Sequence, residues 1–181
     1  MSDAPILIII AVLWTSCVFA ALQLWTGGAQ RAAGMLAGLL VLGAVIIGMR
    51  TGSFGFAWLR SQRLTSDALA LGSLAPTVAL VVTGAVTHRL RSTLFAVTLA
   101  VAGLGAAVSG FAGIAINRSG WYWEFAAVIV GGLTLLVSGV AGATRPDASG
   151  NRRLVHGCEA VFGAFLVVAG AVLAAAWRAM A

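Results

Sequence analysis

Side chains that could do chemistry gather in one short stretch near the end of the chain. His156, Cys158 and Glu159 lie close together, shortly after a pair of arginines. Imidazole, thiolate and carboxylate groups are all competent ligands for transition metals, and two imidazoles can bind a haem iron. If the chain crosses a bilayer six times, His88 falls on the same membrane side. The sequence therefore offers His88, His156, Cys158 and Glu159 as a candidate metal site at the membrane surface. Contact of the histidines with headgroups or backbone carbonyls is the plainer alternative.

The other ionisable side chains have structural explanations. Asp67, Glu124 and Glu159 each fall at the expected start of an apolar segment, where the helix macrodipole and unpaired amides favour a negative charge. We therefore expect no ionisable side chain at the centre of the bilayer, which disfavours a proton pump. The serines and threonines of the apolar segments have no histidine or acid partner there. We predict no catalytic residue and no cofactor, and an enzyme is the less favoured class.

The segments that must position these residues are long and apolar. Of the 181 residues, 61% are apolar and only 9% charged, whereas a soluble domain carries roughly 25% charged residues. Crossing the hydrocarbon core takes about 20 apolar residues, and an open chain satisfies its backbone hydrogen bonds there only as a helix. The sequence therefore predicts an all-α, polytopic integral membrane helical bundle, a single domain over residues 1–181 with about six transmembrane helices. The expected helices cover residues 4–26, 32–49, 67–87, 93–116, 122–143 and 157–177.

Two of the connections between these segments are longer than the others. Residues 50–66 mix arginines with Phe54, Phe56 and Trp58, a mixture typical of a segment lying at the membrane interface. Residues 144–156 contain a proline and a Ser-Gly-Asn turn sequence, and we expect them to form a solvated loop.

The basic residues indicate a lipid surface as partner and no nucleic acid. All eleven are arginines, scattered singly or in pairs between the apolar segments, and the net charge is +6. A nucleic-acid interface would gather them in a stripe with interleaved aromatic residues. Arginine beside apolar helices is typical of contact with a bilayer and its anionic headgroups. The exclusive use of arginine, together with many glycines and alanines, indicates a GC-rich bacterial genome and hence the inner (plasma) membrane.

The orientation in that membrane is nearly balanced under the positive-inside rule. Six arginines fall on the side of the first, third and fifth connections, and five fall on the opposite side. The N-terminal tail is short and acidic and is therefore easily translocated, which favours both termini on the non-cytoplasmic side.

Small residues offer close packing between helices, which is how helices associate in lipid. Gly34 and Gly38 form a GxxxG pair, Gly105 and Ser109 repeat that spacing, and Gly170 has an alanine four residues later. Ordinary packing within the bundle is the plainer interpretation of these residues. Dimerisation through Gly34 and Gly38 is the sharper one.

Pro76 lies about midway along the third apolar segment. Because proline lacks an amide hydrogen, it should kink this helix. Kinks and unwound turns line substrate sites in many transporters, but they also occur as structural bends, which is the favoured interpretation here.

These observations leave three classes of function open. The first is a non-catalytic accessory or scaffolding subunit of a membrane complex, which binds another membrane protein or itself; small-residue faces and missing ionisable groups favour it. The second is a small permease or channel for a neutral or weakly polar solute. Pro76, the glycine-rich fourth segment and a loose repeat of three-helix halves favour this one. The third is an interfacial metal- or haem-binding membrane protein.

Overall fold

The chain is a bundle of long α-helices. The computed structural model describes residues 4–51, 66–87, 92–116, 122–144 and 149–180. These residues form six helices, each long and apolar enough to cross a membrane, so the predicted all-α membrane bundle is confirmed. The helices are α1 (Ala4–Thr26), α2 (Gln30–Thr51), α3 (Ser66–Val86), α4 (Thr93–Ile116), α5 (Trp123–Thr144) and α6 (Ser149–Met180).

The main difference from the predicted boundaries is in the last helix. α1 and α4 have the predicted ends, and α2, α3 and α5 differ by one or two residues at each end. α6 begins at Ser149, so the prediction of a solvated loop over residues 144–156 is wrong from Ser149 onward. The loop was predicted because these residues are polar. Polar residues can still be helical, and arginine is a good helix former. Within the predicted interfacial segment 50–66, residues 52–65 lie outside the described part of the chain.

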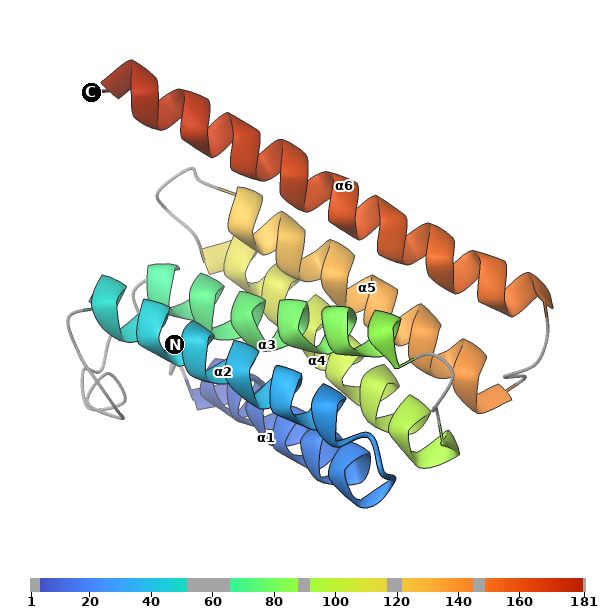
Figure 1. Cartoon of the computed structure of the whole chain (residues 1–181). Helices are drawn as coiled ribbons and strands as arrows, with labels where there is room; N and C mark the ends of the chain where they lie inside the picture. The colour runs from blue at the N-terminus through green and yellow to red at the C-terminus, as the bar shows by residue number, and fades with distance from the viewer. Residues whose placement is uncertain (1–3, 52–65, 88–91, 117–121, 145–148, 181) are drawn as a thin grey trace.

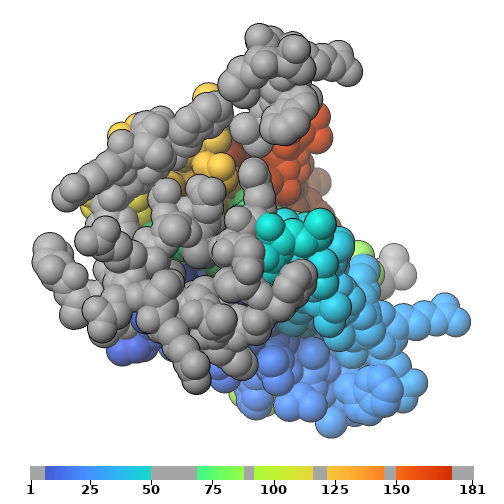
Figure 2. Space-filling view, turned by 90° about the vertical axis from the view of Figure 1, so that its left-hand side faces the viewer, coloured from blue at the N-terminus to red at the C-terminus, as the bar shows by residue number. Residues whose placement is uncertain are grey.

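Consecutive helices run in opposite directions, so α1 begins and α6 ends at the same end of the bundle (Figure 1). α4 and α5 form the most extensive pair, and α3 contacts α1, α2, α4 and α5. α6 packs on α5 and has only a few contacts with α3. Figure 2 looks along the bundle from the end where α1 begins: α1 and α2 (blue to cyan) lie at one edge and α6 (red) at another.

Glycines let α4 and α5 approach each other closely. A Cβ atom added at Gly132 would lie 2.5 Å from the backbone nitrogen of Ala107, closer than real Cβ contacts occur. Cβ atoms at Gly103 and Gly139 would likewise clash with the backbone of the opposite helix. Contact of this kind gives the van der Waals packing that holds helices together in lipid, where the hydrophobic effect does not drive their association.

Hydrogen bonds join α3 to α1 and to α4 close to Pro76. Because proline has no amide hydrogen, the carbonyl oxygen of Gly72, one turn earlier, lacks its usual helical donor. The indole Nε1 of Trp14 in α1 donates to that oxygen at 3.0 Å. Beside it, the hydroxyls of Ser73 and Ser109 are 2.5 Å apart and join α3 to α4. α3 continues through Pro76 as one helix, so side chains of α1 and α4 support it at this point.

Candidate functional site

The depth of each α6 residue in the bundle follows from its contacts with α5. The hydroxyl of Thr134 donates to the carbonyl oxygen of Cys158 at 3.3 Å. α5 runs from Trp123 to Thr144, so Thr134 is at its middle. Glu159, the next residue of α6, therefore lies beside the middle of a helix that is long and apolar enough to span the membrane.

This depth overturns two expectations from the sequence. Glu159 does not open the last helix, because α6 begins at Ser149, so its explanation as a charge at a helix N-terminus is wrong. The same residue also departs from the expectation that the middle of the apolar helices carries no ionisable side chain, because it is level with the middle of α5. An acid inside an apolar span is costly, and it is by default an indication of function. Glu124 does lie in the first turn of α5, as predicted.

Glu159 is paired with His156 on the same helix. His156 Nδ1 lies 3.2 Å from Glu159 Oε2, because residues three apart are neighbours on a helix surface. The histidine side chain is 49% exposed and the glutamate side chain only 13%. Arg152 and Arg153 are exposed one turn earlier. This part of α6 therefore presents basic groups outward, with the carboxylate turned toward the bundle.

The described residues bring together two members of the predicted metal site, His156 and Glu159. His88 lies outside the described part of the chain. Cys158 is two residues from His156, and residues two apart on a helix do not face each other. Within the described ranges, no group of three or more His, Cys, Asp and Glu side chains could hold a metal ion.

Of the residues predicted to pack helices together, Gly105 and Ser109 lie inside the bundle. A Cβ atom at Gly105 would meet Leu13 of α1 at 3.7 Å, which is ordinary van der Waals contact. Ser109 is fully buried against Ser73. The much closer approach of α4 to α5 uses glycines that the GxxxG spacing did not single out. On α5 these are Gly132 and Gly139, which lie seven residues apart and so share a face.

The other predicted packing glycines point away from the bundle. Gly34 and Gly38 lie on the exposed face of α2, and Gly170 lies on that of α6. A Cβ atom at any of the three would have open space around it. These glycines therefore take no part in the packing between described helices, and dimerisation through Gly34 and Gly38 stays a prediction.

α6 contacts the bundle through a narrow stripe. Over residues 150–172, where the burial of α6 is described, its buried apolar residues are Val155, Phe162 and Ala169. They recur every seven positions and so lie on one face. Only 11% of the apolar stretch of α6 is buried, against 56% of that of α4. The remaining faces of α6 are open in the described structure, and the basic residues around His156 lie on them.

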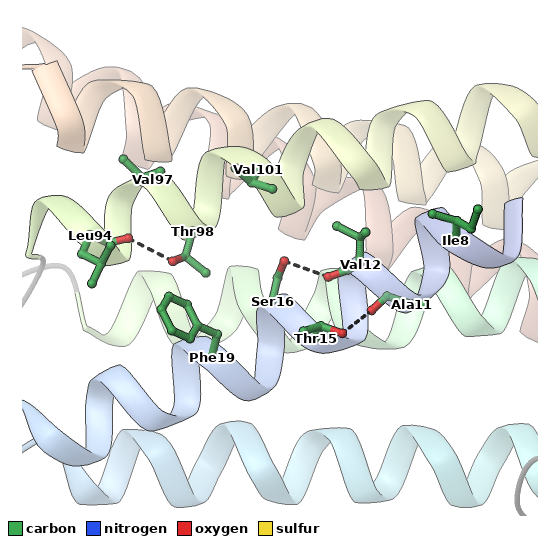
Figure 3. A pocket seen from close by; sticks show the side chains of 10 residues that line it. All are labelled: Ile8, Ala11, Val12, Thr15, Ser16, Phe19, Leu94, Val97, Thr98 and Val101. Carbon is green, nitrogen blue, oxygen red and sulfur yellow. Dashed lines mark hydrogen bonds between the residues drawn. The ribbon is translucent and has the colours of Figure 1, made fainter. Parts of the chain in front are cut away.

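A groove of about 520 Å³ lies between α1 and α4 on the outside of the bundle (Figure 3). The hydroxyls in its lining bond to their own helices: Thr15 donates to Ala11 O at 2.7 Å and Ser16 to Val12 O at 2.8 Å. Thr98 bonds to its own helix in the same way. The rest of the lining is apolar, so the groove suits an apolar chain better than a polar solute.

No protein-family model matches this sequence, and comparisons with curated proteins and with solved structures likewise give no match.

Proposed function

We propose that the chain is a non-catalytic accessory subunit that binds another membrane protein through α6. The observation that carries this proposal is the small buried share of α6, 11% of its apolar stretch. Helices in lipid are held together by van der Waals packing and interhelical hydrogen bonds. A helix of 32 residues that packs along one stripe gains little of either from the rest of the chain. A second protein on its open faces would supply those contacts.

Features that favoured a permease have packing explanations. Three of the four glycines of α4 are used in close contact with α5, namely Gly103, Gly110 and Gly113. The carbonyl that Pro76 leaves without a backbone donor accepts a hydrogen bond from Trp14. The groove between α1 and α4 has an apolar lining. The permease therefore ranks second and the interfacial metal or haem site third.

The proposal is tested by extracting the protein from its native membrane in mild detergent or nanodiscs and weighing the assembly by native mass spectrometry. We expect a second protein at fixed stoichiometry and no haem absorption in the visible spectrum. A monomer or homo-oligomer without pigment would remove the accessory role and favour the permease, for which solute-dependent thermal stabilisation is the next test. Bound haem or stoichiometric metal would favour the site at His156.

We also propose that this membrane is the inner membrane of a bacterium, with both termini on the non-cytoplasmic side. The exclusive use of arginine supports the bacterial origin. The start of α1 and the end of α6 lie at the same end of the bundle (Figure 1), which supports a shared side for the termini.

A further inference from the structure

We infer that the open face of α6 binds a transmembrane helix of a partner protein that carries a carboxylate at the depth of Arg153. This inference rests on the proposed accessory role and adds the chemistry of the partner to it. The face is defined by four exposed residues of α6: Arg153, Gly157, Ala160 and Ala164.

Helical geometry places these four residues on the side of α6 that points away from the bundle. Their spacings of four, three and four residues align them along one face. Ala164 lies about 160° around the helix from the buried Phe162. Because three of the four residues are glycine or alanine, the backbone of another helix can approach closely, as α4 approaches α5 at Gly132.

With the bilayer centred on the middle of α5, the basic groups beside this face lie at hydrocarbon depth. Cys158 is level with the middle of α5 through its bond to Thr134. Arg153 precedes Cys158 by five residues, which is about 7.5 Å of helix, and the hydrocarbon core extends about 15 Å on either side of its centre. A charge that faces lipid at such a depth is costly, and an opposite charge on a neighbouring helix compensates it.

The carboxylate of α6 itself does not serve this purpose. Glu159 is mostly buried and pairs with His156. It lies about 120° around the helix from Arg153, too far for the neighbouring positions at which side chains of one helix meet. Among the residues that the structure describes, neither Arg152 nor Arg153 forms an ion pair, and both are exposed. They therefore leave a basic surface that an acidic residue of another molecule would complement.

A second copy of this chain does not fit the same surface. Two copies inserted in the same orientation meet about an axis along the membrane normal, so their α6 helices run parallel and each residue faces its own equivalent. Arg153 would then lie against Arg153 of the other copy, and like charges repel. The basic character of the face thus favours a different protein.

The first test enlarges two side chains on this face of α6. In the tagged full-length chain, Ala160→Leu and Ala164→Leu keep its apolar character but block close approach. We expect both variants to lose the partner on extraction, whereas Ala44→Leu, at an exposed position of α2, keeps it. A melting temperature equal to that of the parent verifies that each variant folds. Retention of the partner by both α6 variants would overturn the inference and leave the accessory role intact, because the partner would then bind another face.

The second test removes the charge. Arg153→Gln should weaken partner binding by roughly tenfold or more, since hydrogen bonds to charged groups are the strong ones, whereas Arg31→Gln on α2 should leave it unchanged. A photo-crosslinking residue at Ala164 should capture a transmembrane segment of the partner that contains Asp or Glu. Unchanged affinity of Arg153→Gln, or capture of a segment without an acid, would overturn the inference. Capture of a second copy would overturn it as well, and purification of the chain alone would instead refute the accessory role itself.

Discussion

The indole of Trp14 replaces a backbone amide that α3 lacks. Pro76 cannot donate to the carbonyl oxygen of Gly72, and Trp14 Nε1 does so from α1 at 3.0 Å. Cys17, on the same side of α1, places its Sγ 3.8 Å from the carbonyl oxygen of Pro76. In hydrocarbon no water can bond an unsatisfied carbonyl, so such a group costs several kcal/mol. The contribution of Trp14 to the stability of the protein should therefore depend on whether residue 76 is a proline.

Trp14→Phe should lower the free energy of unfolding by roughly 1–3 kcal/mol, because it keeps an aromatic ring but leaves the Gly72 carbonyl without its indole donor. In a Pro76→Ala background the loss should be smaller, since residue 76 then has an amide that donates to Gly72. Thermal unfolding of the four members of this cycle in mild detergent measures the difference. Trp25→Phe, at an exposed tryptophan of α1, is the control. Equal losses in the two backgrounds would contradict this role of Trp14.

The pair on α6 leads to a second prediction for single residues. His156→Ala removes the imidazole that lies 3.2 Å from the Glu159 carboxylate, which is only 13% exposed, and a mostly buried polar group that loses one of its partners is destabilised. We expect a loss of about 1 kcal/mol, as for a typical hydrogen bond. Adding Glu159→Gln removes the charge and should recover part of that loss. A double variant that melts below His156→Ala would show that the carboxylate has other, more important contacts.

For whole helices, the effect of a glycine depends on what the helix faces. Gly132→Ala should destabilise the bundle by roughly 1–3 kcal/mol, as overpacking does, because the added Cβ would lie 2.5 Å from the Ala107 backbone nitrogen. Gly34→Ala should be neutral or stabilise the protein by up to about 1 kcal/mol, because nothing lies within 4 Å and alanine is the better helix former. Melting temperatures in one detergent compare the two. Similar losses at both positions would indicate that Gly34 is covered in solution.

The last helix shows where a prediction from hydropathy stops. Residues 149–156 are polar enough to be assigned to a loop, yet they form the first two turns of α6. Polarity measures the cost of contact with lipid, whereas helix formation depends on backbone preference and on packing such as that of Val155. The depth of Glu159 was misjudged for this reason, since it was assigned to the start of a helix whose start lay further back.

For the whole molecule, the even number of described helices places the start of α1 and the end of α6 together (Figure 1). If both termini face away from the cytoplasm, alkaline phosphatase fused after Ala181 should be active and a green fluorescent protein at the same position should be dark. The arginine counts of six and five make this a close decision under the positive-inside rule. An inactive phosphatase fusion together with a fluorescent green fluorescent protein fusion would place both termini in the cytoplasm.

The sequence by itself determined that this is a helical membrane protein and where most of its helices lie. Long apolar segments exclude a water-facing surface, and lipid leaves the backbone of each segment no open alternative to a helix. The ends of α1 and α4 followed from this reasoning directly. These properties depend on each segment and its solvent, and not on its neighbours.

Only the tertiary structure decided which residues meet. It buries Gly132 against α4 and leaves Gly34 exposed, pairs Trp14 with Gly72, and sets Glu159 beside the middle of α5. Each of these facts depends on the rotation and the axial register of one helix against another. Lipid is as apolar as the interior of the bundle, so the lipid-facing and inward-facing sides of a helix are equally apolar. Hydropathy therefore does not indicate which side faces inward. Contacts between backbones, and the hydrogen bonds that lipid cannot replace, select that face instead.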